Sequence, residues 1–244
     1  MHYKQVAPAL LFSLIVVSVS ASSQNTPKTH ASRKHSAPAS LLSQLQAARV
    51  TAVPQPLVIG GQVVCKAAGN STNPKMIALD SRKNRTDIPS ANAYISLDWN
   101  VLSGLPSKSP DDLQGAPVMV EGYLSHQIKV QTEPPGESTN CNLLNDDEVD
   151  WHMYLTNAPN QGIADAIIVE TTPRTRPLHQ WNKATLDNLV NKNTRVRISG
   201  WLMYDFEHAP EIGKERATVW EVHPITRMEV ADGSGGWKDV EQSH

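Results

Sequence analysis

The stretch from Thr194 to Val230 constrains the possible fold more strongly than any other part of the chain. Its two ends, Thr194–Phe206 and Arg216–Val230, are long segments in which apolar and polar residues alternate, and a polar loop joins them. A period of two predicts β-strands, because successive side chains of a strand point to opposite faces of a sheet. We therefore expect two neighbouring strands here that close the hydrophobic core.

The alternation also assigns core residues within these two strands. The apolar side chains expected to face inward are Val196, Ile198, Leu202, Val219 and Ile225. Trp220 and Val222, however, alternate opposite Val219. Either one face of the second strand is assigned wrongly, or both of its faces are covered by other parts of the chain.

Three strand segments and one helix precede this pair. The expected strands are Pro117–Val130, Val149–Thr156 and Ala166–Thr171, and the expected helix is Asn182–Val190 with Asn182 at its N-cap. Gly122 lies midway along the first strand, where a long strand needs to bend. The order strand, strand, strand, helix, strand, strand over about residues 115–230 resembles the OB-fold, a five-stranded Greek-key barrel. The chain is thus expected to be mainly β, with an OB-like five-stranded barrel, one helix and an N-terminal extension.

Four phrases of the sequence resemble a group of exported bacterial proteins that have no assigned function. They are DWHMYL, VETTPR, VRISGWLMYD and VWEVHPITRMEV. The resemblance implies secretion and an OB-like barrel. It carries over no catalytic residue, so the function has to be inferred from the residues themselves.

The first 21 residues have the pattern of a signal peptide. Lys4 gives a basic start, Ala7–Val19 is an apolar run, and Val19-Ser20-Ala21 supplies the small residues of a cleavage site. The run is shorter than the roughly 20 apolar residues that a membrane-spanning helix needs. We expect a secreted or periplasmic protein with no transmembrane segment after cleavage.

Composition suggests the remaining boundaries. Residues 22–50 lack a sustained apolar pattern and are expected to be a flexible linker, with a short helical turn in Leu41–Val50. Residues 51–114 are too poor in apolar side chains for a domain of their own, so we expect an extension packed on a barrel of residues 115–231, followed by a loose tail, 232–244. Elements expected in the extension are a strand at Leu57–Cys65 interrupted by Gly60 and Gly61, a strand at Met76–Leu79 and a helix within Ser96–Leu105.

Cys65 and Cys141 are the only cysteines of the chain. An oxidising compartment outside the cytoplasm favours a disulfide between them. The alternative is that Cys141 is a metal ligand together with Asp150 and His152, which follow it closely in the sequence.

Charge argues against nucleic acid as a partner. Five of the 22 Lys and Arg residues lie in residues 1–50, which contain no Asp or Glu, so the rest of the chain, with all 24 acidic residues, has a net charge of −7. Affinity for nucleic acid comes largely from basic side chains that neutralise phosphates. A single-stranded nucleic-acid site would use stacking by Tyr123, Trp201 and Tyr204 and the charges of Arg174, Arg176, Arg195 and Arg197. Arg195 and Arg197 alternate with apolar residues, which is also typical of the polar face of a half-buried strand.

Histidine and carboxylate pairs supply the candidate metal ligands. Asp150 and His152 share one strand face, Glu221 and His223 share another, and Asp205, Glu207 and His208 lie at the end of the fourth strand. Nitrogen and carboxylate oxygen ligands suit a divalent ion such as zinc. The candidate ligands are therefore His152, His223, Glu221, Asp150 and His208. The alternative is that these side chains face water on the outside of the barrel, with His223-Pro224 ending a strand or making a turn.

The most economical function is an exported, non-catalytic binding or structural domain of the bacterial envelope, without a cofactor. Its partner would be a protein, a glycan or a small ligand. The first alternative is a metal-dependent hydrolase that uses the His and carboxylate groups, although the chain has no Gly-x-Ser-x-Gly or His-Glu-x-x-His motif. The second alternative is a single-stranded nucleic-acid-binding OB domain.

Overall fold

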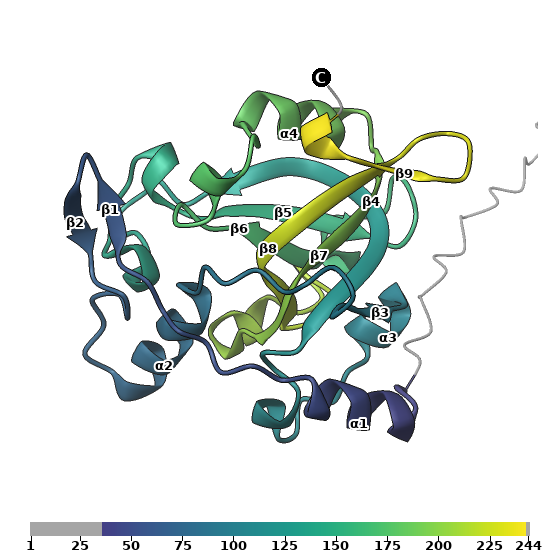
Figure 1. Ribbon diagram of the computed structural model, residues 1–244, viewed down its shortest axis with the longest axis horizontal. Coiled ribbons are helices and arrows are strands. Elements are labelled where there is room, and N and C mark those ends of the chain that lie inside the picture. Colours follow the sequence, from purple (N-terminus) through teal and green to yellow (C-terminus); the bar gives the residue numbers. More distant parts are fainter. Residues whose placement is uncertain (1–35, 243–244) are drawn as a thin grey trace, which may run out of the picture. The chain divides into compact units, whose positions relative to one another are not determined.

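A computed structural model describes residues 36–242 of the chain (Figure 1). The expected signal peptide, residues 1–21, and the first part of the expected linker lie outside the described residues. Strands make up 31% and helices 27% of the described structure, so the fold is mixed α/β rather than mainly β. Within residues 36–242, no helix is both long enough and apolar enough to cross a membrane.

A seven-stranded sheet organises the fold. Its strands are β3 (Ile95–Leu97), β4 (Pro117–Val130), β5 (Trp151–Thr156), β6 (Ile167–Thr171), β7 (Arg195–Tyr204), β8 (Trp220–Ala231) and β9 (Trp237–Asp239). Five of them form a hydrogen-bonded ring in the order β4, β5, β6, β8, β7, which the antiparallel pairing of β7 with β4 closes. Within the ring, β6 and β8 are parallel and the other neighbours are antiparallel. β3 and β9 are added outside the ring, on β4 and β8.

Helices and a separate hairpin surround this ring. The α-helices are α1 (Ala39–Ala47), α2 (Pro74–Lys83), α3 (Trp99–Ser103) and α4 (Lys183–Asn191), and the hairpin strands are β1 (Leu57–Ile59) and β2 (Gln62–Cys65). Short 3₁₀ helices are η1 (Pro110–Asp112), η2 (Ser138–Asn140), η3 (Asp146–Glu148), η4 (Ile163–Asp165), η5 (Arg176–Leu178), η6 (Phe206–Glu211) and η7 (Val240–Gln242). The five ring strands and α4 lie where the sequence predicts them. The side chain of Asn182 caps α4 by accepting a hydrogen bond from the backbone N–H of Thr185 at 2.9 Å.

The prediction of a strand at Met76–Leu79 is wrong, because these residues lie in α2. Asn73 caps this helix by accepting from the N–H of Lys75 at 3.0 Å, and Pro74 occupies its first turn, where proline favours helix initiation. A run of four residues is too short for its periodicity to separate a strand from a helix. The N-cap residue Asn73, followed by Pro74, indicates a helix more clearly than the short apolar run indicates a strand.

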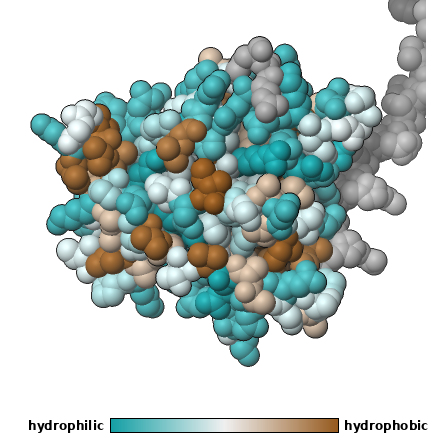
Figure 2. All heavy atoms as spheres, in the orientation of Figure 1, coloured by the Kyte–Doolittle hydropathy of each residue, from teal (hydrophilic) through white to brown (hydrophobic). Residues whose placement is uncertain are grey.

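The segment Leu57–Cys65 forms a hairpin rather than one interrupted strand. Gly60 and Gly61 both have positive φ angles, 57° and 80°, the conformation that a tight two-residue hairpin turn requires. Only Leu57 and Cys65 are buried, whereas the hairpin exposes Val58, Ile59, Val63 and Val64. Figure 2 shows these apolar side chains as a brown patch at the left edge of this view.

Both ends of the described chain add to the structure. Helix α1 occupies the last part of the segment that the sequence assigns to a flexible linker, and its Leu45 is fully buried in the main core. The tail, expected to be loose, instead pairs as β9 with β8, with Asp239 opposite Glu229.

The main core fills the inside of the ring, and the opposite face is also covered. Side chains of β5 and β6 such as Met153 and Val169 point into this core, as do Trp220 and Val222 of β8. Val219 and Glu221 lie on the other side of β8 and are nevertheless buried. The conflict in the alternation of this strand is therefore resolved: both of its faces are covered.

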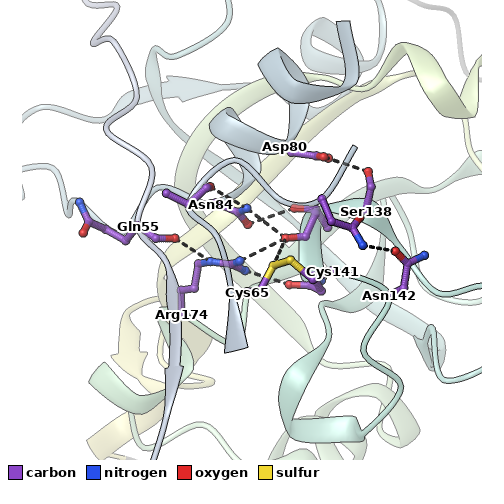
Figure 3. The surroundings of a disulfide bond; sticks show 12 residues. Gln55, Cys65, Asp80, Asn84, Ser138, Cys141, Asn142 and Arg174 are labelled. Atoms are coloured by element: carbon purple, nitrogen blue, oxygen red, sulfur yellow. Dashed lines mark hydrogen bonds between the residues drawn. A yellow bond between two sulfur atoms is a disulfide. The ribbon is translucent and has the colours of Figure 1, made fainter. Parts of the chain in front are cut away.

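A disulfide joins Cys65, the last residue of β2, to Cys141, which follows η2 (Figure 3). The two Cα atoms are 5.4 Å apart, within the usual range for a bridge. Arg174 of the loop after β6 reinforces this junction by donating to the carbonyl of Thr139 at 3.1 Å and to Asn140 Oδ1 at 2.9 Å. Because Cys141 is bonded to Cys65, it has no free thiolate for a metal ion.

Removing the disulfide should destabilise the protein substantially. The bridge closes a loop between residues 76 positions apart. In the chain-entropy model, a loop of this length contributes roughly 4–5 kcal/mol. We expect the double variant Cys65→Ser/Cys141→Ser to lose about this much unfolding free energy in urea titrations. A loss equal to the effect of a conservative surface substitution would contradict this expectation.

Candidate metal centre

Three strands of the ring each place a polar side chain on the face that points away from the main core. His152 of β5 pairs directly with Glu170 of β6, and the parallel pairing of Val169 with Val222 brings His223 of β8 beside Glu170. His152, Glu170 and His223 are 4%, 0% and 1% exposed. Asp150, just before β5, joins them and is also fully buried.

This polar face is buried because other segments cover it. Lys83 of α2, Glu137 in the loop before η2 and Arg216 before β8 all reach side chains on this face. The alternative that these side chains face water is therefore wrong for His152, Asp150, Glu221 and His223. Strand alternation separates the two faces of a sheet, but it does not say what packs on the second one.

The side chains form a continuous chain of carboxylates and imidazoles. His223 Nε2 lies 3.7 Å from Asp150 Oδ2, and His223 Nδ1 lies 2.9 Å from Glu170 Oε2. His152 Nε2 then lies 3.4 Å from Glu170 Oε2 and 3.6 Å from Glu137 Oε1. The centre thus contains two histidines between three carboxylates.

The central atoms approach one another without forming well-directed hydrogen bonds. Among the residues that the structure describes, both oxygens of Asp150 and Glu170 and both ring nitrogens of His223 lack a hydrogen-bond partner. One ligand atom from each of these three residues lies within 4.8 Å of the others. Buried polar atoms are normally paired, because leaving one unpaired costs about 1–3 kcal/mol. Atoms that converge on a shared space without pairing fit the surroundings of a cation.

The pKa shifts of Glu170 and His223 indicate that the buried carboxylates and imidazoles interact strongly with one another. Burial alone would raise the pKa of Glu170, but His152 and His223 overcome burial and hold that pKa well below its ordinary value. Burial alone would lower the pKa of His223, whereas Glu170 and Asp150 raise it above its ordinary value. The carboxylate of Glu170 therefore stays ionised at neutral pH and is able to bind a positive charge.

A second cluster lies at the end of β7. Asp205 Oδ2 contacts Lys83 Nζ at 3.0 Å and His208 Nδ1 at 2.9 Å. Burial alone would raise the pKa of Asp205, but Lys83 and His208 hold it well below its ordinary value. Although Asp205, His208 and Glu221 also lie within 4.8 Å of one another, the ammonium of Lys83 already supplies a buried cation here.

Glu221 belongs to this second cluster and is paired with an arginine. The guanidinium of Arg216 contacts Glu221 Oε1 at 2.5 Å and Glu211 Oε2 at 3.1 Å. Burial and the neighbouring carboxylates of Asp205 and Glu170 raise the pKa of Glu221 to about 7, against the opposing effect of Arg216. The sequence candidates therefore divide, with His208 and Glu221 in this ion-paired cluster and Asp150, His152 and His223 in the first. Glu207 is exposed and outside both clusters.

His223-Pro224 lies inside β8, so the prediction that it ends a strand or makes a turn is wrong. The facing strand has Gly200 at this point, where a Cβ atom would come within 2.4 Å of the Pro224 carbonyl oxygen. The pairing of β7 with β8 is irregular on both sides of Gly200. A glycine opposite the proline thus lets the strand continue.

Sequence reasoning missed Glu170, Glu137, Lys83 and Arg216. Glu170 carried a usable signal, since it is the single charged residue in the otherwise apolar strand Ile167–Thr171. The others come from loops or from α2, and their positions depend on long-range packing that no local pattern reveals.

The residues considered for nucleic-acid stacking do not form an open platform. Trp201 is covered by the guanidinium of Arg85, which lies 3.4 Å from its ring centre. Tyr204 packs edge-on against Trp220, and Arg174 and Arg176 are buried. The remaining pair, Arg195 and Arg197, binds Glu121, as expected for the polar face of a strand.

Comparison with models of protein families and with curated proteins finds no match, so the centre is interpreted from its own geometry.

Breaking the buried ion pair should be costly. In Asp205→Asn, Lys83 remains buried without its carboxylate, and removing one partner of a buried pair costs about 3–5 kcal/mol. Urea unfolding checks the loss. The control Glu121→Gln breaks pairs with Arg195 and Arg197 at a carboxylate that is 37% exposed, where about 1 kcal/mol or less is expected. Equal losses in the two variants would contradict a special contribution from burial.

His208 should make the unfolding free energy depend on pH above about 6.5, which is the pKa of an unperturbed histidine. Burial lowers the pKa of His208, but Asp205 raises it beyond its ordinary value. Its contribution to the unfolding free energy is therefore complete below the unfolded pKa and is lost as pH rises through the folded one. Between pH 6 and 9, the unfolding free energy of His208→Gln should fall less steeply than that of the wild type. Parallel curves would rule out this linkage.

Proposed function

We propose that the chain is an exported, OB-like binding domain whose buried centre binds one divalent metal ion of the zinc type. The ligands are Asp150, Glu170 and His223, with His152 holding Glu170 from the other side. The observation that carries the proposal is the convergence of these fully buried ligand atoms, whose contacts, including the 2.9 Å between His223 and Glu170, lack well-directed hydrogen-bond geometry.

Charge and chemistry favour a divalent ion. Metal binding displaces the protons of its ligands, so two carboxylates and the imidazole of His223 would then balance a charge of +2, and zinc binds nitrogen and carboxylate oxygen ligands at about 2.0–2.2 Å. Ligand atoms at that bond length are roughly 3.3–3.6 Å apart in a tetrahedral site, and the 3.7 Å between His223 Nε2 and Asp150 Oδ2 is close to this value. Binding through one ring nitrogen of His223 leaves the other to a carboxylate, an arrangement that orients metal-ligating histidines.

The fold and the disulfide support the rest of the proposal. A ring in the order β4, β5, β6, β8, β7 with a helix between its third and fourth strands in the sequence supports the OB-like part of the proposal. The disulfide is compatible with a secreted or periplasmic location. Nucleic acid stays an unfavoured partner, because Trp201 and Tyr204, two of the three aromatic residues considered for stacking, are packed against other side chains.

A binding function is favoured over the metal-dependent hydrolase. Catalytic zinc sites use three protein ligands and keep a fourth position for water or substrate, and the three ligands proposed here leave such a position. Solvent does not reach the ligands, however, since Asp150 and Glu170 are both 0% exposed. A reaction at the ion would therefore require the cover to move.

Metal analysis tests the proposal directly. Protein purified without a histidine tag should contain about one divalent ion per chain, and zinc added to chelator-treated protein should raise its melting temperature. His223→Ala should abolish binding in calorimetric titrations, and His152→Gln should weaken it by about 10–100-fold. The matched control His126→Ala removes an exposed histidine of β4 and should leave binding unchanged.

Wild-type protein provides the decisive measurement, because a ligand variant that fails to fold would also fail to bind metal. Cobalt added to the chelator-treated wild type should give the visible absorption of a low-coordinate site with nitrogen and oxygen ligands. If neither zinc nor cobalt binds the folded wild type, the centre is a buried network in which a charged His223 bridges two carboxylates, and the metal proposal is wrong.

A further inference from the structure

A cleft of about 370 Å³ lies beside the candidate centre. Its walls come from four separate parts of the chain: the segment 49–52 after α1, helix α2 with Arg85 beyond it, residues 111–115, and residues 201–203 of β7. His223 is also part of its lining. The volume is within the range of pockets that bind small molecules.

The cleft is rich in arginine. Arg49 is exposed and makes no hydrogen bond or ion pair with any residue in the described part of the chain. Arg82 pairs with Asp111 at 3.0 Å, but Asp111 is 76% exposed, so this pair is weak and opens readily to a competing anion. Arg85 is satisfied by Asp87 at 2.6 Å, and its guanidinium adds positive charge to the wall. Of the three arginines, Arg82 and Arg85 are thus each paired with an aspartate, and Arg49 is left without a partner in the described part of the chain.

The cleft also contains an unused hydrogen-bond acceptor. The side chain of Gln114 donates through Nε2 to Asp111, which identifies Oε1 as its acceptor atom. This oxygen is buried and has no partner among residues 36–242, and Gln114 itself is only 8% exposed. A buried acceptor of this kind needs an N–H or O–H donor from whatever occupies the cleft.

We propose that this cleft binds a small hydroxylated organic anion, such as a sugar phosphate or a sugar acid. The carboxylate or phosphate group binds Arg49 and Arg82, because guanidinium groups match these anions with paired hydrogen bonds. A hydroxyl of the ligand donates to Gln114 Oε1. Side chains such as Met203 cover the less polar part of the ligand.

This site is argued without the metal ion. Of the residues assigned to the metal centre, only His223 lines the cleft, while Asp150 and Glu170 lie outside its lining. If the protein binds no metal, the anion-site proposal is therefore unaffected. If it binds no anion, the metal proposal is likewise unaffected. Asp150→Asn separates the two, because it removes a metal ligand without changing the wall of the cleft.

Calorimetric titration of the full exported chain with four probes tests the proposal. Glucose 6-phosphate and gluconate carry both an anionic group and hydroxyls, glucose carries hydroxyls alone, and hexanoate carries charge alone. We expect at least one of the first two to bind clearly more tightly than both controls. A preference for glucose 6-phosphate indicates a phosphate ligand, and a preference for gluconate indicates a carboxylate ligand.

Three variants locate the binding. Arg49→Ala should weaken binding of the preferred probe by about tenfold or more, the loss expected for a hydrogen bond to a charged group. Gln114→Met should reduce the preference for that probe over hexanoate. The control Lys192→Ala removes an exposed basic residue beyond α4 and should have no effect. The proposal is overturned if no probe binds at millimolar concentration, or if Arg49→Ala and Lys192→Ala bind the probe equally well.

Discussion

The buried ion pair between Lys83 and Asp205 is the interaction on which the covered face of the ring depends. Taking an ammonium and a carboxylate out of water costs several kcal/mol for each ion, so both must be well paired. Asp205 meets this demand with Lys83 at 3.0 Å, with His208 at 2.9 Å and with the backbone N–H of Glu207. Because Lys83 belongs to α2 and Asp205 ends β7, the pair holds the extension against the ring.

The two buried clusters differ in how their negative charge is neutralised. In the cluster at the end of β7, Lys83 and Arg216 each contact a carboxylate directly. Around Asp150 and Glu170, the close partners are the imidazoles of His152 and His223 instead. An imidazole, unlike the ammonium of Lys83 or the guanidinium of Arg216, can give up its proton and then bind a metal ion, so the second arrangement is able to accept an added cation. This contrast explains why we assign the metal ion to one cluster and not to the other.

The sequence predicts the local elements of the ring well and the cover poorly. Alternation locates β4 to β8, and Asn182 marks the start of α4, because these signals lie within a few residues of one another. The pairs Asp150/His152 and Glu221/His223 are visible for the same reason. Their convergence is not visible, since it depends on the parallel pairing of β6 with β8. Glu170 lies in a mostly apolar strand segment, and nothing near it in the sequence indicates that its face is buried under other polar groups.

The position of β8 has a consequence for the order in which the protein folds. β8 is the last strand of the ring, and it supplies Glu221 and His223 to the face that α2 covers. Synthesis, however, produces α2 more than 100 residues earlier. Contacts between such distant segments form slowly, because a long loop has to close before they contribute. The extension therefore stays undocked until the C-terminal half of the chain has formed the surface against which it packs.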